Sequence, residues 1–238
     1  NAEGFVGRVM VFNPSDNSLD WASEELFPAR ASHTVTVLQD GSLFAAGGFT
    51  GLSSYAFPLS TTNVLEPPYG DGWQDTLPLR EARAVHTATL LSDGRVLVVG
   101  GYGLDDEILS TAEIFDVSSN DVQPVASMHV PRAAHTAGLL PDGRVIVVGG
   151  ENELGVTNTT EIYDPTTNEW KYGPMLNVPR AGHTMVVLPK RIVVIGGYDS
   201  ESSRAAGVEI LDLIKDVGDS CTADGECTSG HCVDGVCC

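Results

Sequence analysis

Two residue types that can carry chemistry, histidine and arginine, recur at a fixed spacing along the chain. The motif Arg-x-x-His-Thr occurs four times, and successive histidines lie 53, 49 and 48 residues apart. The motif residues are Arg30 and His33, Arg83 and His86, Arg132 and His135, and Arg180 and His183. Four imidazoles around one axis could bind a metal ion, and four guanidinium groups could bind an anionic ligand.

A structural role explains these residues more simply, because a residue found in every unit of a repeat protein usually serves the fold. We therefore interpret the histidines as hydrogen-bonding groups between units and predict no metal site. We interpret the arginines as partly buried partners of a recurring acid, because each has one in its own unit. These acids are Glu66, Glu113, Glu161 and Glu209.

The positions around the motif repeat as well and predict four strands in each unit. Asp-Gly follows the first three histidines by seven residues, and a Gly-Gly pair follows in all four units. We expect a strand from His-Thr, a hairpin turn at Asp-Gly, and an apolar second strand that is buried on both faces. The Gly-Gly pairs end this second strand, where φ is positive or another backbone comes close: Gly47-Gly48, Gly100-Gly101, Gly149-Gly150 and Gly196-Gly197.

A third strand is expected at the acidic-apolar stretch, as in Glu161–Asp164, and a fourth strand carries a tryptophan in some units. Trp73 and Trp170 fill that position, whereas Val122 or Gln123 stands near it in the second repeat. The segment Val9–Pro14 matches Glu161–Pro165, and Trp21 is assigned to the position of Trp170. The chain is therefore expected to begin in the third and fourth strands of a unit.

This pattern resembles the Kelch repeat, and the resemblance covers residues 5–212. It implies an all-β fold, a β-propeller in which each repeat forms a four-stranded blade around a central channel. We assign residues 1–212 to the propeller, with a partial blade at residues 5–27 and repeats starting near residues 28, 80, 131 and 179. About four to five blades are present, whereas Kelch propellers commonly have six or seven, so the chain is expected to be part of a larger ring.

The cysteines of the chain all lie in a short segment that follows an expected linker at residues 213–220. They are Cys221, Cys227, Cys232, Cys237 and Cys238. Clustered cysteines in a Gly- and Asp-rich segment favour disulfides made in an oxidising compartment over a zinc site. The segment resembles short cysteine-rich repeats of secreted proteins from myxobacteria and related bacteria. We therefore expect a secreted or cell-surface protein with a disulfide-rich tail. Because the number of cysteines is odd, one of them has no disulfide partner within this segment.

The charge and hydropathy of the sequence disfavour several classes of binding partner. The formal net charge is −19, which disfavours nucleic acid and anionic membranes. Such acidity serves solubility or the binding of divalent cations, and no motif with calcium-loop spacing supports calcium. No apolar run approaches the ~20 residues that a membrane-spanning helix needs.

Catalytic motifs are lacking as well, so we predict a binding module without a cofactor. The expected propeller resembles the one found in galactose-oxidase-like enzymes, and that resemblance implies a copper site with a cysteine-linked tyrosine. No cysteine precedes residue 221, so this site cannot form here. The chain has no Gly-x-Ser-x-Gly motif and no zinc-protease motif.

The loops that follow Gly-Gly differ between repeats, and variable loops on a regular scaffold are where recognition usually occurs. We predict that their aromatic and acidic residues bind a protein or a glycan: Tyr55, Phe57, Tyr102, Asp105, Asp106, Glu107, Glu151, Glu153, Tyr198, Asp199 and Glu201. Two alternatives remain. The chain could belong to an extracellular enzyme whose catalytic residues lie elsewhere, or to a filament or matrix in which open blade edges self-associate.

Overall fold

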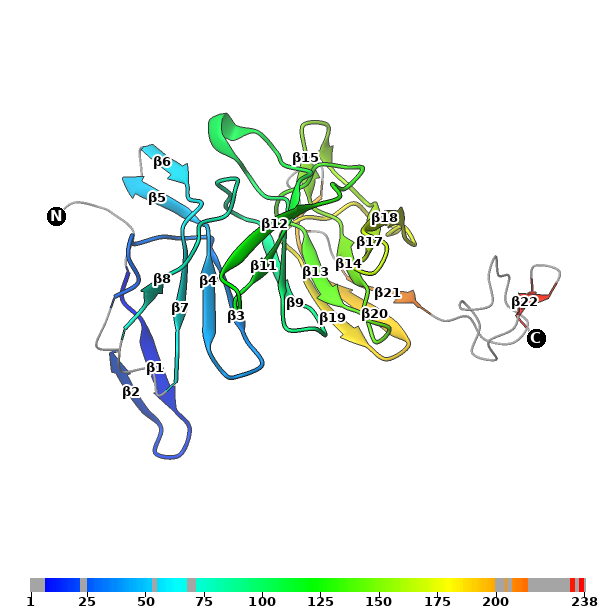
Figure 1. Cartoon of the computed structure of the whole chain (residues 1–238). Helices are drawn as coiled ribbons and strands as arrows, with labels where there is room; N and C mark the ends of the chain where they lie inside the picture. Colours follow the sequence, from blue (N-terminus) through cyan, green and yellow to red (C-terminus); the bar gives the residue numbers. More distant parts are fainter. Residues whose placement is uncertain are drawn as a thin grey trace.

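Four antiparallel sheets follow one another along the chain (Figure 1). The structure is a computed structural model, and it describes residues 7–21, 25–52, 55–67, 72–199, 204, 207–213, 232–233 and 236–237. The first sheet contains β3 (Thr34–Val37), β4 (Leu43–Ala46), β7 (Thr62–Leu65) and β8 (Gln74–Asp75). The second contains β9 (Thr87–Leu90), β10 (Val96–Val99), β11 (Ala112–Asp116) and β12 (Asp121–Val125). The third contains β13 (Thr136–Leu139), β14 (Val145–Val148), β17 (Thr160–Asp164) and β18 (Glu169–Tyr172).

The fourth sheet has three strands in the described part of the chain, in the order β19 (Thr184–Leu188), β20 (Arg191–Ile195) and β21 (Val208–Asp212). The first strands of neighbouring sheets contact one another, β3 with β9, β9 with β13, and β13 with β19. Each sheet is therefore a propeller blade whose first strand is innermost. The predicted all-β propeller of four-stranded blades is confirmed.

The second strand of each inner blade is buried on both faces, as its apolar sequence predicts. In β10, Val96 and Val98 pack with Phe44 of the first blade. Leu97 and Val99 pack on the other side with the core of the third blade. Full burial of each such side chain contributes roughly 2 kcal/mol, so the boundaries between blades form the core of the protein.

The two ends of the blades differ in structure. At one end, the turn face, the Asp-Gly turns connect the first and second strands; Gly94 there has a φ of +90°, and Asp93 Oδ1 accepts the Arg95 N–H. At the other end, the loop face, lie the Gly-Gly pairs and the loops that follow them. Two small hairpins extend from the loop face: β5 (Phe49–Leu52) with β6 (Tyr55–Pro58), and β15 (Glu151–Asn152) with β16 (Gly155–Val156).

Both glycines of each pair are required by the backbone. Gly100 and Gly101 have φ values of +62° and +96°. A Cβ on Gly101 would lie 2.5 Å from the Ala84 carbonyl oxygen, and one on Gly100 would lie 2.5 Å from the Arg132 carbonyl oxygen of the next blade. Positive φ and close approach therefore occur together at Gly100 and Gly101, whereas Gly196 has a positive φ with no atom within 4 Å of its ideal Cβ position.

The N-terminal segment forms a hairpin of β1 (Met10–Asn13) and β2 (Ser18–Trp21), which corrects one expectation. Phe12 pairs with Leu19, as Tyr163 pairs with Trp170, whereas Trp21 pairs with Met10. The assignment of Trp21 to the position of Trp170 is therefore wrong, because the turns at residues 14–17 and 165–168 have the same length.

The outward face of the fourth blade exposes apolar side chains that the inner blades bury. Val208 and Ile210 are 57% and 55% exposed, and Val186 and Ile195 are also exposed. In the cysteine-rich segment, the structure describes β22 (Cys232–Val233) and β23 (Val236–Cys237), in which Cys232 pairs with Cys237 along the backbone. Cys221, Cys227 and Cys238 lie outside the described residues, and the disulfides remain a prediction.

Candidate binding site

The residue directly after each Gly-Gly pair occupies an equivalent place on the loop face. These residues are Phe49, Tyr102, Glu151 and Tyr198. Each forms an antiparallel backbone bridge to the alanine that follows the motif arginine: Ala31 to Phe49, Ala84 to Tyr102, Ala133 to Glu151, and Ala181 to Tyr198. This bridge places one residue from each of the four adjacent blades close to an innermost strand.

Three of these residues meet. The Tyr102 hydroxyl donates to Glu151 Oε1 at 2.5 Å, which joins the second and third blades. The Tyr198 phenol of the fourth blade lies close enough to Glu151 for the carboxylate to raise the pKa of the phenol. All three side chains are half-buried. We call this set of Tyr102, Glu151 and Tyr198 the Tyr–Glu–Tyr cluster.

The electrostatic surroundings keep both phenols protonated. Burial, followed by the hydrogen bond to Glu151, raises the pKa of Tyr198 to about 12. The same causes raise the pKa of Tyr102 well above its ordinary value, and the charge of Asp106 adds to the effect. Both phenols are therefore protonated at all physiological pH values, and that of Tyr102 donates to the carboxylate.

The other predicted loop residues surround this cluster or lie apart from it. Asp105 and Asp106, within the short 3-10 helix η1 (Leu104–Asp106), are exposed and have positive φ values of +55° and +60°. Glu107 and Glu153 are exposed, and Asp199 is half-buried beside Tyr198 in the chain. Phe57 is 44% exposed on β6. Tyr55 begins that strand, its side chain lies outside the described residues, and so does all of Glu201.

The four motif arginines are buried inside their own blades and do not line the channel mouth. Arg132 donates to the Gly149 carbonyl at 2.7 Å and to Glu161 Oε1 at 2.9 Å. Arg83 and Arg180 make the equivalent bonds to Glu113 and Glu209. These side chains therefore tie the Gly-Gly strand end to the third strand.

The first blade departs from the expected pairing. Arg30 donates to Asn63 Oδ1 at 2.8 Å, and Asn63 has the same strand register as Glu161. Glu66 follows β7 and is exposed, so its assignment as the partner of Arg30 is wrong. The reason is that Thr62–Leu65, not the acidic residue after it, forms the third strand.

The motif histidines lie at the boundaries between blades. The Nε2 atom of His86 is 3.0 Å from Thr34 Oγ1, that of His135 is 2.9 Å from Thr87 Oγ1, and that of His183 is 2.8 Å from Thr136 Oγ1. Burial, with the neighbouring Arg83 charge, lowers the pKa of His86 to about 3. Within the described part of the chain, no group of three or more His, Cys, Asp or Glu residues is arranged to hold a metal ion.

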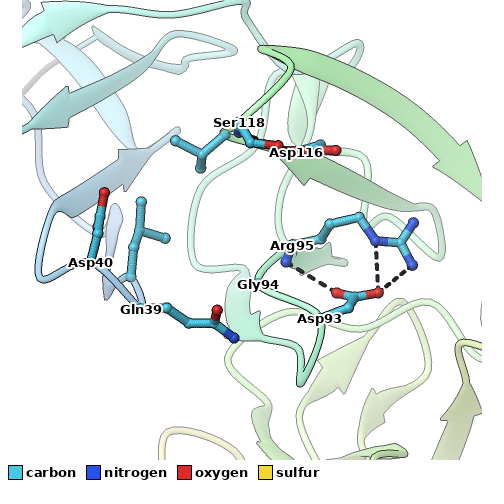
Figure 2. Close-up of a pocket in the computed structure, with 9 residues that line it drawn as sticks. Gln39, Asp40, Asp93, Gly94, Arg95, Asp116 and Ser118 are labelled. Carbon is cyan, nitrogen blue, oxygen red and sulfur yellow. Dashed lines mark hydrogen bonds and ion pairs between the residues drawn. The ribbon is translucent and has the colours of Figure 1, made fainter.

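A hollow of about 360 Å³ lies on the turn face, away from the Tyr–Glu–Tyr cluster. Figure 2 shows it between the Gln39-Asp40 turn, the Asp93–Arg95 turn and the Asp116–Ser118 turn. Two of its acidic side chains already have partners within the turns. Arg95 forms an ion pair with Asp93 at 2.7 Å, and Asp116 accepts two hydrogen bonds from Ser118. A similar hollow lies one blade further along, lined in part by Asp142, Arg144 and Asp164. The repetition indicates a feature of the turns rather than a specific site.

The blades and their boundaries define a β-propeller built from Kelch-type units, and comparisons with known proteins agree. A family model described as the KLHDC2/KLHL20/DRC7 Kelch-repeats domain matches residues 2–197, and a Kelch motif matches residues 179–217. The chain therefore belongs to the Kelch-repeat family.

The solved structure titled "Structure of YjhT" has a similar fold. It superimposes with a TM-score of 0.71 at 14% sequence identity, over 88% of this chain and 77% of that chain. A search of curated proteins found no significant match. None of the described helical segments is long and apolar enough to cross a membrane.

Proposed function

We propose that this chain is a non-catalytic, extracellular module that binds a protein through the loop face of its propeller. The observation that supports it is the convergence of Tyr102, Glu151 and Tyr198 from three blades. Tyrosines with one apolar face and one hydrogen-bonding end are favoured in protein interfaces. Kelch propellers commonly mediate protein–protein interaction, which fits the family assignment.

Two sequence features support the extracellular and non-catalytic parts of the proposal. The clustered cysteines of residues 221–238 favour an oxidising compartment. The motif histidines and arginines, which by residue type could bind a metal ion or an anionic ligand, are engaged in bonds within and between blades.

A site-specific photo-crosslinker tests the proposal. We would place it at Leu154, which is 98% exposed on the loop face, and at Ser119, which is exposed on the turn face. Each labelled protein is mixed with the extracellular fraction of the producing cells and with a glycan panel. We expect a discrete protein adduct from Leu154 that excess unlabelled protein removes. Adducts from Ser119 alone, or binding to glycans without a protein adduct, would contradict the proposal.

A second candidate function, self-association, is favoured by the exposed face of the fourth blade. Thr34, Thr87 and Thr136 each contact the histidine of the next blade. Thr184 occupies the same position, and no described histidine reaches it. The first blade of a second copy offers His33 and the exposed Val35 and Val37 to this face.

Light scattering over a wide range of protein concentration tests this candidate. We expect dimers for the wild type and monomers for Val208→Lys combined with Ile210→Lys. A wild type that stays monomeric at every concentration would exclude self-association through this face.

A further inference from the structure

Among the described residues, the half-buried Glu151 has no ion-pair partner, unlike the glutamates on the third strands of the second, third and fourth blades. Glu113, Glu161 and Glu209 pair with an arginine at 2.6–2.9 Å. Glu151 is contacted by two neutral phenols, and no described residue forms an ion pair with it. Its carboxylate therefore has no ion-pair partner among the described residues, and the basic residue Arg204 forms a backbone bridge to Tyr198.

We propose that the Tyr–Glu–Tyr cluster binds a primary ammonium group, the side chain of a lysine on the protein partner. This inference rests on the proposed function and names the chemistry of its central contact. A partly buried carboxylate that has no ion-pair partner gains from a cation that reaches it in the complex.

The hydrogen-bonding capacity of the cluster fits an ammonium. The Tyr102 phenol donates its single proton to Glu151, and both phenol oxygens keep lone pairs that accept. The two phenol oxygens and the carboxylate together offer three acceptors, and an ammonium has three donors and no acceptor. The tyrosine rings add an attraction for a cation over their faces.

Other cations fit less well. An arginine prefers a carboxylate that presents both oxygens as a free fork, whereas Glu151 Oε1 already accepts from Tyr102. A divalent metal needs several oxygen ligands that carry charge, and the described residues offer no such group of acids here.

The surrounding charge favours the approach of a basic partner. Asp105, Asp106, Glu107 and Glu153 are exposed on the same face. Arg204 is the one basic side chain in the described parts of the loops that follow Gly-Gly. With a net charge of −19, the protein attracts a basic segment over long range, and salt weakens that attraction.

Nuclear magnetic resonance titration with three short peptides tests the inference. The peptides share one blocked, uncharged sequence and carry a central lysine, arginine or acetyl-lysine. We expect the lysine peptide to bind the wild type more tightly than the arginine peptide, and the acetyl-lysine peptide not to bind. Glu151→Gln should weaken lysine binding roughly tenfold or more. Tyr102→Phe should weaken it less, because it removes one acceptor and leaves the charge.

Glu153→Gln is the matched control, because it removes the same charge two residues away on an exposed side chain. We expect it to weaken binding by less than about twofold. Equal losses for Glu151→Gln and Glu153→Gln, or binding of the acetyl-lysine peptide, would overturn the ammonium site. Thermal melts of all variants establish that the fold is intact. If the Leu154 adduct persists without a preference for lysine, the ammonium site fails and the loop-face function stands.

Discussion

Thr87 and His135 are joined across the boundary between the second and third blades, with 2.9 Å between Thr87 Oγ1 and His135 Nε2. The same threonine–histidine contact joins the first blade to the second and the third to the fourth. The imidazoles are 5–6% exposed at these three boundaries. The contact therefore recurs at each boundary between the four described blades, where it adds a polar link to the apolar core.

Replacement of His135 by alanine should destabilise the fold. We expect His135→Ala to lower the free energy of unfolding by about 2–4 kcal/mol, because it removes the hydrogen bond and leaves a cavity between blades. Thr87→Val, which removes only the hydrogen bond, should cost about 1 kcal/mol. Chemical denaturation measures both values. An unchanged unfolding curve for His135→Ala would contradict the structural role of the histidine.

Mild acid should lower the free energy of unfolding, because the same histidines are buried in their neutral form. Burial lowers the pKa of His86 to about 3 and that of His183 to about 4, and it lowers the pKa of His135 well below its ordinary value. The unfolded chain binds protons at these sites near pH 6.5, so stability is full above that pH and falls as the pH decreases toward the folded pKa values.

Each of the three histidines contributes up to about 1.4 kcal/mol of this loss per pH unit below about pH 6.5. Urea unfolding at a series of pH values measures the slope, and His86→Gln should reduce it by one histidine's share. A slope that is the same in the variant and the wild type would show that His86 is not buried in its neutral form.

The buried arginine–glutamate pair should contribute far more to stability than an exposed arginine–aspartate pair of the same blade. Arg132 and Glu161 are fully buried, whereas Arg144 and Asp142 are 44% and 49% exposed. We expect Arg132→Met to cost about 3–5 kcal/mol, because it removes the only buried cation beside Glu161 among the described residues and leaves its carboxylate with the contacts from His129 and Val130. Arg144→Met should cost less than about 1 kcal/mol. Similar losses for the two variants, measured by chemical denaturation, would be inconsistent with burial of the first pair.

Alanine substitutions at two glycines with similar φ values should distinguish the cost of steric crowding from the cost of backbone strain. Gly101 has a φ of +96° and a backbone oxygen 2.5 Å from its ideal Cβ position, whereas Gly155 has a φ of +109° and no atom within 4 Å of that position. We expect Gly155→Ala to cost about 1–2 kcal/mol from strain alone. Gly101→Ala should cost at least about 3 kcal/mol, because the Ala84 carbonyl must also move. Thermal unfolding checks the difference, and equal costs would mean that the strand end is loosely packed.

The sequence was sufficient to predict the features that each repeat encodes locally. Glycine at positive φ, apolar second strands and recurring Arg-x-x-His motifs follow from short-range geometry that is the same in every blade. The errors arose where one repeat departs from the others. Asn63 replaces the expected acid in β7, and Leu19 rather than Trp21 occupies the tryptophan position of the N-terminal hairpin.

The Tyr–Glu–Tyr cluster could be predicted only as three members of a longer residue set. Tyr102, Glu151 and Tyr198 lie on different blades and almost fifty residues apart. Whether their side chains touch depends on the distance between neighbouring blades, which no local pattern contains. The one sequence signal is positional, since all three directly follow Gly-Gly. That signal would also have identified Phe49, which the sequence prediction missed.

The position after Gly-Gly also has an evolutionary consequence. Its backbone is fixed by the bridge to the alanine of the same blade, whichever residue occupies it. The chain already has phenylalanine, tyrosine and glutamate in this position. Selection can therefore alter what the loop face recognises one codon at a time, while the arginines, histidines and glycines that hold the blades together remain unchanged.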